Sequence, residues 1–208
     1  MKNIQKNNIW IVENSYTDKM KILRKYWKIK KKRNMKTNQL QKNIFLIGFM
    51  GSGKTSVSLQ LSGMTGLKKQ EMDQILTQRE KMTVAEIFER KGEPYFREQE
   101  TVLLKQFGGG DPQIISCGGG VAMKEENVGI MRESGTVVCL TASADVIYER
   151  VKDSRERPIL NGNMSVEYIQ QLMEARRPFY EAAADVIVDT SHMRIDQVAE
   201  AVLSAVSQ

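Results

Sequence analysis

Residues 43–55 read NIFLIGFMGSGKT, and the rest of the fold can be predicted outward from this stretch. Residues 44–47 are all apolar, which is typical of a strand that is buried on both faces. Residues 48–55 then match the pattern G-x-x-x-x-G-K-[ST] in the strand-then-loop context that a phosphate-binding loop requires. Glycines allow successive backbone amides to turn toward one anion at the start of a helix. The stretch therefore predicts a binding site for a nucleoside triphosphate.

The side chains of this loop have separate expected tasks. Lys54 brings a positive charge to the outer phosphates, and the hydroxyl of Thr55 is a ligand for Mg²⁺. The remaining nucleotide contacts are expected from Gly51, Ser52, Gly53 and Ser56. The alternative is a glycine-rich turn that opens an ordinary helix, and the apolar strand before the loop argues against it.

Composition limits the other possibilities. A chain of 208 residues fits one domain with a tail, or at most two small domains. No apolar run approaches the length of a membrane span, and the N-terminus lacks a signal-peptide core, so we expect a cytoplasmic protein without membrane contact. Cys117 and Cys139 lie in apolar runs and are expected to be reduced core residues.

The net charge of +6 is unevenly distributed. Residues 1–42 contain 13 lysines and arginines against two acids, a net charge of +11, so residues 43–208 carry −5. We expect residues 1–42 to be a basic, disordered extension of a catalytic domain at 43–208. A start codon assigned too far upstream, with Met35 as the true start, is equally compatible. Nucleic-acid or anionic-membrane contact by a basic helix at 19–32 is the functional alternative, and we expect neither partner.

Strands alternate with helices along the domain, which predicts an α/β fold with a parallel sheet. We expect strands at 44–47, 68–73, 113–117, 136–140 and 185–188, and helices at 55–62, 83–91, 94–106, 124–134, 144–151, 165–176 and 196–206. The strand at 68–73 is polar and is therefore expected at the sheet edge. Gly63 and Gly66 should end the first helix, and the last helix but one should stop before Pro178.

Three features outside the phosphate loop point to chemistry. Glu71 and Asp73 are two residues apart, so a strand would direct both carboxylates to one side, as suits metal-water coordination and hydroxyl orientation. Arg97 and Glu100 lie one helical turn apart and are expected to pair. Residues 118–120 are three glycines directly after a strand, where a ligand can approach the backbone closely. Two acids in a loop are more often solvated, so the first feature alone is weak.

Together these residues resemble the shikimate kinase family over residues 43–206. The matching landmarks are the phosphate loop, the acid pair Glu71/Asp73, residues 88–100 (FERKGEPYFREQE), the three glycines, Arg157-Pro158 and residues 176–180 (RRPFY). The resemblance implies a three-layer P-loop kinase fold, with helices on both faces of a five-stranded parallel sheet and a mobile lid at 154–163. It implies MgATP-dependent phosphorylation of the 3-hydroxyl of shikimate to shikimate 3-phosphate and ADP, in aromatic amino-acid biosynthesis.

The resemblance also implies roles for individual residues. Asp73 holds the hydroxyl to be phosphorylated, and Arg97 and Arg176 grip the shikimate carboxylate, while Gly118, Gly119 and Gly120 contact the ring. Arg157 closes over the phosphates from the lid, Arg150 is the candidate for adenine contact, and Glu71 assists Thr55 in holding Mg²⁺. With Lys54, the expected catalytic set is Asp73 and Arg157. We expect a monomer.

Two departures from the family pattern leave alternatives open. Glu71 stands where the family usually has Asp, and residues 68–70 (KKQ) are polar where the family has an apolar strand. A gluconate kinase of the same fold is the nearest rival enzyme, and the Arg97/Arg176 pair with the three glycines argues against it. A nucleotide-binding regulatory module without catalysis would be indicated by loss of Lys54, Asp73 or Arg157, and all three are present.

Overall fold

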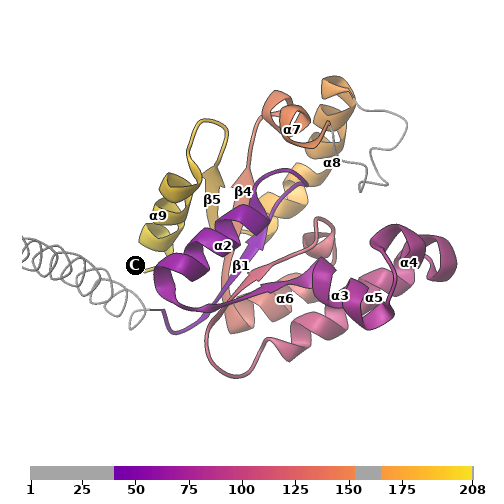
Figure 1. Ribbon diagram of the computed structural model, residues 1–208, viewed down its shortest axis with the longest axis horizontal. Coiled ribbons are helices and arrows are strands. Elements are labelled where there is room, and N and C mark those ends of the chain that lie inside the picture. The colour runs from indigo at the N-terminus through magenta and orange to yellow at the C-terminus, as the bar shows by residue number, and fades with distance from the viewer. Residues whose placement is uncertain (1–39, 153–164, 208) are drawn as a thin grey trace, which may run out of the picture. The chain divides into compact units, whose positions relative to one another are not determined.

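The computed structural model describes residues 40–152 and 165–207 (Figure 1). Contacts divide the chain into the units Met1–Gln39 and Leu40–Gln208, and the fold below is that of the second unit. The predicted extension up to residue 39 and the predicted lid at 154–163, including Arg157, lie outside the described residues.

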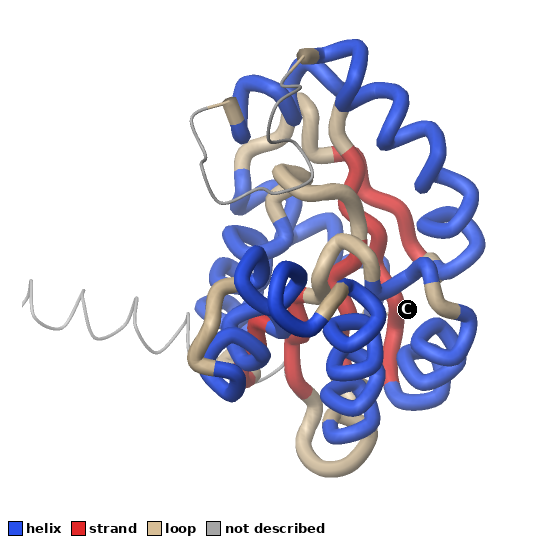
Figure 2. Tube along the Cα trace, turned by 90° about the vertical axis from the view of Figure 1, so that its right-hand side faces the viewer, coloured by secondary structure: helices blue, strands red, loops and turns tan. Residues whose placement is uncertain are grey.

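The centre of this unit is a sheet of five parallel strands in the order β2-β3-β1-β4-β5. Figure 2 shows the strands enclosed by helices. The predicted five-stranded parallel sheet is confirmed, with strands at β1 (Asn43–Ile47), β2 (Lys68–Glu71), β3 (Gln113–Ser116), β4 (Gly135–Thr141) and β5 (Val186–Asp189). Because β1 lies in the middle, the phosphate loop that follows it opens at the centre of the sheet edge formed by the carboxyl ends of the strands.

Alternation along β1 separates two hydrophobic cores. Phe45 and Ile47 enter the larger core, whereas Ile44 and Leu46 enter the smaller one. Both faces of the strand are thus buried, which explains its continuous apolar run. The larger core is formed with α3 (Met72–Glu80), α4 (Val84–Lys91), α5 (Glu93–Gln106), α6 (Glu125–Ser134), α7 (Ala144–Val151) and α8 (Val166–Ala183), and the smaller core with α2 (Lys54–Thr65) and α9 (Ile195–Val206). The predicted three-layer arrangement is confirmed.

Several helix ends follow the local signals in the sequence. Thr83 and Glu86 form a capping box at the start of α4, with the Thr83 hydroxyl accepting from the Glu86 amide. Gly92, at φ 86°, separates α4 from α5, and Pro94 lies in the first turn of α5. These positions were predicted.

Two predicted helix ends were wrong, and two elements were missed. Helix α2 continues past Ser62 to Thr65, because Leu61 and Thr65 are buried and offset the cost of Gly63, and Gly66 at φ 82° ends it. Helix α8 does not stop before Pro178 but runs to Ala183, since Tyr180 and Ala183 are buried on its inner side. The helix α3 and a short 3₁₀ turn at Val121–Met123 were not predicted.

The polar strand β2 lies at the sheet edge, as predicted, and pairs only with β3 among the described strands. It ends at Glu71, so Asp73 belongs to the first turn of α3. The expectation that a strand directs both carboxylates to one side was therefore wrong. Tertiary packing, not strand alternation, decides where the two acids point.

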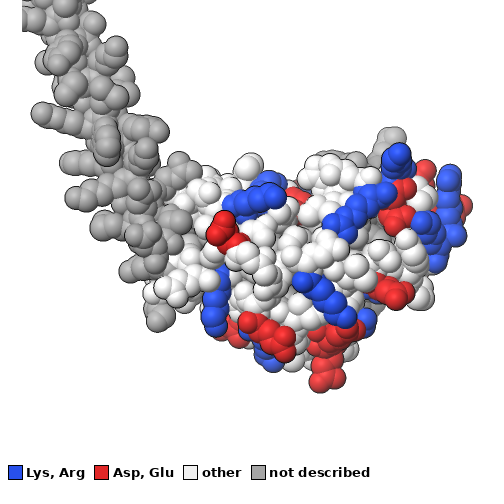
Figure 3. All heavy atoms as spheres, turned by 90° about the horizontal axis from the view of Figure 1, so that it is seen from below, with Lys and Arg blue, Asp and Glu red and all other residues white. Residues whose placement is uncertain are grey.

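The surface of the described residues is mixed in charge. Figure 3 shows lysines and arginines interspersed with acids on one face of the described residues, 40–152 and 165–207. A basic stripe typical of phosphate-backbone binding is not seen on that face. None of the helices described here is both long enough and apolar enough to span a membrane.

Candidate active site

The phosphate loop has the backbone that its glycines predicted. Gly48, Gly51 and Gly53 have φ of 132°, 75° and 100°, a region that side-chain-bearing residues rarely adopt. A Cβ at Gly48 would lie 2.2 Å from the carbonyl oxygen of Leu140, so the loop passes directly against β4. Gly53 then serves as the N-cap of α2, and the loop amides gather at a helix N-terminus that favours an anion.

The Lys54 side chain lies back over this loop. Its Nζ donates to the carbonyl oxygens of Gly48 and Phe49 at 2.8 and 3.0 Å. An ammonium group held at this point faces the space where the outer phosphates of a nucleotide would lie.

A cluster of oxygen atoms adjoins the loop. The Thr55 hydroxyl donates to Oε2 of Glu71 at 3.0 Å, and the Ser58 hydroxyl donates to Oε1 at 2.6 Å. Lys69 pairs with the same carboxylate at 3.2 Å. Hydroxyl and carboxylate oxygens suit Mg²⁺, which binds proteins through one or two ligands plus substrate phosphates. Among the described residues no group of three or more His, Cys, Asp or Glu side chains forms a metal cage. Thr55 and Glu71 thus fit a metal that arrives with its nucleotide.

A cavity of about 460 Å³ brings part of the predicted set together, whereas Arg97, Gly118, Gly120 and Arg176 are not among the residues that line it. It is lined by the phosphate loop from Met50 to Ser56 except Ser52, and by residues from three other segments: Glu71, Asp73, Gln74, Ser116, Cys117, Gly119 and Arg150. Glu71 and Asp73 therefore meet at one cavity although they belong to different elements. Ser52 is fully buried beneath the loop.

The glycines after β3 are in contact with charged side chains. A Cβ at Gly118 would lie 2.4 Å from Oε1 of Glu100 and 2.7 Å from Oδ1 of Asp73. A Cβ at Gly120 would lie 2.2 Å from a guanidinium nitrogen of Arg97. Glycine is needed at these two positions because the charged groups occupy the space that a larger residue would take.

Arg97 is held by two acids on its own helix. Its Nε and one terminal nitrogen donate to Glu93 at 3.0 and 2.6 Å, and the other terminal nitrogen donates to Glu100 at 2.8 Å. The guanidinium carbon also lies 5.7 Å from the ring centres of Phe88 and Phe96. The Glu93 side chain is 56% exposed, so it occupies a guanidinium edge that a ligand carboxylate can use instead.

Glu100 is an unusual carboxyl group. Its side chain is 0% exposed, and its Oε1 is a buried atom without a hydrogen-bond partner in the described part of the chain. Burial raises the pKa of Glu100 to about 7; the Arg97 charge opposes this rise, and the nearby Asp73 adds to it. The bond to Glu100 fixes the position of the Arg97 guanidinium. The ionised form of Glu100 repels the negative charge of Asp73.

Arg176 approaches the same place from α8. Its guanidinium carbon lies 5.7 Å from the centre of the Phe49 ring in the phosphate loop. Tyr180, one turn further along α8, donates its hydroxyl to the carbonyl oxygen of Gly119 at 2.6 Å. Burial raises the pKa of Tyr180 to about 12, so the phenol keeps this proton. Helix α8 is thus bonded to the glycine turn, and Arg176 faces it.

Arg150, the adenine candidate, connects the phosphate loop to the segment after β5. It donates to the carbonyl oxygen of Gly51 at 3.1 Å, and to the hydroxyl and carbonyl oxygens of Thr190 at 3.0 and 2.9 Å. The edges of its guanidinium are used by these bonds, which leaves a flat face for stacking.

Four contributors were not given a role from the sequence. Glu93 is visible as an i, i+4 partner of Arg97, and Glu100 was expected only as a pair. Ser58 lies one turn after Thr55 on α2, and Tyr180 one turn after Arg176 on α8. Helical spacing from a predicted site residue was the signal available for all four.

Comparison with known proteins finds similar sequences and similar structures. A family model described as shikimate kinase matches residues 50–207. The shikimate kinases of Thermodesulfovibrio yellowstonii and Geobacter sulfurreducens are 38% and 40% identical over 162 and 157 residues, which is 78% and 76% of this chain and 93% and 86% of those proteins.

Solved structures give the same result. Shikimate kinase from Acinetobacter baumannii in complex with shikimate has a TM-score of 0.74 at 28% identity, covering 78% of this chain and 91% of that one. Shikimate kinase from Aquifex aeolicus has a TM-score of 0.67 at 36% identity, covering 78% and 95%. A gluconokinase from Sinorhizobium meliloti, at 18% identity and a TM-score of 0.52 over 81% and 93%, shares the fold alone.

Proposed function

The chain belongs to the shikimate kinase family, and on that premise we propose that its site transfers the γ-phosphoryl group of ATP to the 3-hydroxyl of shikimate. The products are shikimate 3-phosphate and ADP, and the reaction is a step of aromatic amino-acid biosynthesis. The observation that supports the acceptor is the meeting of Asp73, Arg97 and the glycine turn beside the phosphate loop.

In the proposed reaction the phosphate-loop amides and Lys54 hold the β- and γ-phosphates. Asp73 accepts a hydrogen bond from the 3-hydroxyl, which orients its oxygen toward the γ-phosphorus. The bond from this oxygen to phosphorus forms as the bond from phosphorus to the β–γ bridging oxygen breaks. The hydroxyl proton passes to Asp73, and the charge of the leaving group remains on ADP.

The carboxylate of shikimate is proposed to lie between Arg97 and Arg176. A planar guanidinium matches a carboxylate with two parallel hydrogen bonds. Glu93 withdraws when the ligand arrives, because both compete for the same edge of Arg97. Glu100 stays in place and keeps Arg97 aimed at the glycine turn.

Mg²⁺ is proposed to be held by Thr55 directly and by Glu71, which already share a hydrogen bond. The metal would neutralise phosphate charge when bound. The extra methylene of Glu71, relative to Asp, is accommodated by the bonds from Ser58 and Lys69. Arg150 is proposed to stack on adenine. Arg157 and the lid remain proposals that rest on the family resemblance.

The proposed catalytic domain is 43–208, with 1–42 as a basic extension that takes no part in the reaction. We propose a monomer that acts in the cytoplasm without nucleic-acid contact.

A coupled assay of ADP release tests the function directly. We expect shikimate to support turnover and gluconate to give no rate above the ATP-only background. Equal rates with both acceptors, or a rate with gluconate alone, would contradict the proposal.

Replacing Asp73 by Asn removes the proposed proton acceptor and keeps the shape of the side chain. Turnover should fall by about 10²–10⁴-fold, with ATP affinity nearly unchanged. The matched control is Asp145→Asn on the exposed side of α7, which should leave both quantities as they are. Turnover of the Asp73 variant within a few-fold of the wild type would reject the role of Asp73.

A further inference from the structure

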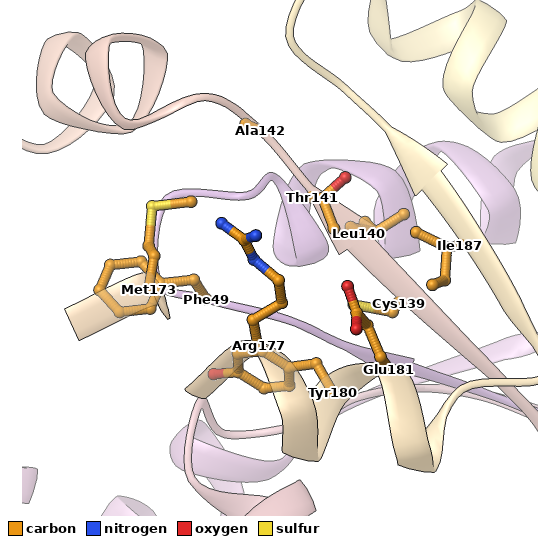
Figure 4. Close-up of a pocket in the computed structure, with 10 residues that line it drawn as sticks. All are labelled: Phe49, Cys139, Leu140, Thr141, Ala142, Met173, Arg177, Tyr180, Glu181 and Ile187. Carbon is orange, nitrogen blue, oxygen red and sulfur yellow. The ribbon is translucent and has the colours of Figure 1, made fainter. Parts of the chain in front are cut away.

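A second cavity of about 340 Å³ lies between α8 and the adjoining strands β4 and β5 (Figure 4). Most of its wall is apolar, with the side chains of Phe49, Met173, Tyr180 and Ile187 among those that line it. The residues proposed to bind phosphate and Mg²⁺, such as Lys54, Thr55 and Glu71, line the other cavity and not this one. Its size is at the lower end of ligand pockets, which span about 300–1,000 Å³.

This cavity is open at the sheet edge. Ile187 is 52% exposed on β5, the last strand of the sheet, although its neighbours in the wall are mostly buried. This large β-branched side chain forms part of the cavity wall and still meets water. An apolar ligand that covers it would remove apolar surface from water, which favours binding.

Two opposite charges enter the cavity from α8. Figure 4 shows Arg177 and Glu181 extending from the helix into the same space. They are four residues apart, which places their Cβ atoms about 5–6 Å from each other. In the described part of the chain, the ion pair recorded for Arg177 is a long one of 4.0 Å to Glu174, outside the cavity.

We propose that this cavity binds a free α-amino acid with a large apolar side chain. Such a molecule carries its carboxylate and ammonium group on one carbon, so Arg177 and Glu181 can each meet a charge of opposite sign. A simple anion would face Glu181, and an uncharged apolar ligand would remove both charged groups from water without compensation.

The wall favours an aromatic side chain within this class. The rings of Phe49 and Tyr180 offer edge and face contacts, and the Met173 sulfur offers a further favourable aromatic contact. L-phenylalanine is therefore the probe, and the inference does not depend on the proposed kinase reaction.

Calorimetric titration of the full chain with L-phenylalanine, without ATP or shikimate, tests the proposal. We expect saturable binding that is weakened about tenfold or more when the probe is 3-phenylpropanoate, which lacks the ammonium group, or 2-phenylethylamine, which lacks the carboxylate. Absence of saturable L-phenylalanine binding, or equal binding of all three compounds, would overturn it.

Two variants locate the binding. Arg177→Gln and Glu181→Gln should each weaken L-phenylalanine binding about tenfold or more, because each removes one charged contact. The matched controls Arg90→Gln on α4 and Glu167→Gln on α8 make the same chemical changes on exposed side chains outside the cavity and should change nothing. Binding that survives both cavity variants unchanged would overturn the assignment of the site. Equal losses in the controls would do the same.

Discussion

At the scale of single residues, the three glycines after β3 differ in what surrounds them. Gly118 faces Glu100 and Asp73, Gly120 faces Arg97, and a Cβ at Gly119 would meet its nearest atoms only at 3.9–4.0 Å. The last distances are ordinary van der Waals contacts. An added methyl group is therefore expected to have a different effect at each of the three positions.

The series Gly118→Ala, Gly119→Ala and Gly120→Ala tests these contacts. Gly118→Ala should lower the free energy of unfolding by about 1–3 kcal/mol, because Glu100 is buried and cannot swing away, and it should lower kcat through Asp73. Gly120→Ala should mainly raise KM for shikimate, since it displaces the longer and partly exposed Arg97 side chain. Gly119→Ala should leave the free energy of unfolding unchanged and serves as the stability control.

Urea unfolding and steady-state kinetics on the three variants provide the measurements. Equal destabilisation by all three substitutions would contradict this assignment of contacts, as would a KM effect confined to Gly118→Ala.

Glu100 makes the stability of the protein depend on pH. Its pKa is about 7 in the folded chain against the ordinary 4.5, so the folded state binds more protons between these values. The contribution to stability is fully present below about pH 4.5 and is lost as pH rises through 7, at about 1.4 kcal/mol per pKa unit. Melting temperatures of the wild type and Glu100→Gln should therefore change relative to each other in this window, in favour of the variant as pH rises. A pH-independent difference would rule out titration of Glu100.

At the scale of elements, α4 shows how a local signal supports the site. Its capping box starts the helix, and the helix brings Phe88 against Phe96 at 5.2 Å and beneath the Arg97 guanidinium. Thr83→Ala should lower the free energy of unfolding by about 1 kcal/mol through loss of the cap. Thr77→Ala, inside α3, is the control and should be neutral or slightly stabilising, because Ala is the better helix former. Similar losses of unfolding free energy from both substitutions would show that the cap of α4 makes no specific contribution to stability.

Local signals in the sequence predict a helix or a strand correctly only where tertiary packing does not outweigh them. The apolar run of β1, the capping box at Thr83 and the edge position of β2 were all predicted correctly. Pro178 and Gly63 were misread as helix ends because the packing of distant residues against the same helices outweighs their intrinsic cost. The helix α3 was missed because its polar composition hides two buried residues, Met72 and Leu76.

At the scale of the whole molecule, every described residue of the proposed site lies within Leu40–Gln208. A chain that starts at Met35 should therefore keep its turnover and its melting temperature. The truncation retains Leu40, which is buried in the smaller core. As a control for that boundary, Leu40→Ala should cost about 2 kcal/mol or more of stability. Loss of activity in the Met35 protein would show that residues 1–34 are needed by the catalytic domain.

The grouping of the site residues is also a property of the whole molecule. Asp73, Arg97, Gly118 and Arg176 come from four separate segments, and no periodicity in the chain relates them. Their grouping was expected only through the family resemblance, whereas the parallel sheet and the phosphate loop follow from the residues themselves. The bond from Arg97 to Glu93 joins residues four apart on one helix, so their spacing could have indicated it. The bond from Tyr180 to the carbonyl oxygen of Gly119 depends on tertiary packing and lay beyond either argument.

The contact of Gly118 and Gly120 with charged side chains also constrains how such a chain diverges by mutation. A side chain at either position strikes Glu100, Asp73 or Arg97, so the fitness cost of each substitution depends on which residues stand at the other positions. We therefore expect a single substitution at either glycine to give a less active protein unless a contacting residue changes as well. Lys68, which is exposed at the start of the edge strand β2, is under no such interlocking constraint, and there sequence drift is free to accumulate.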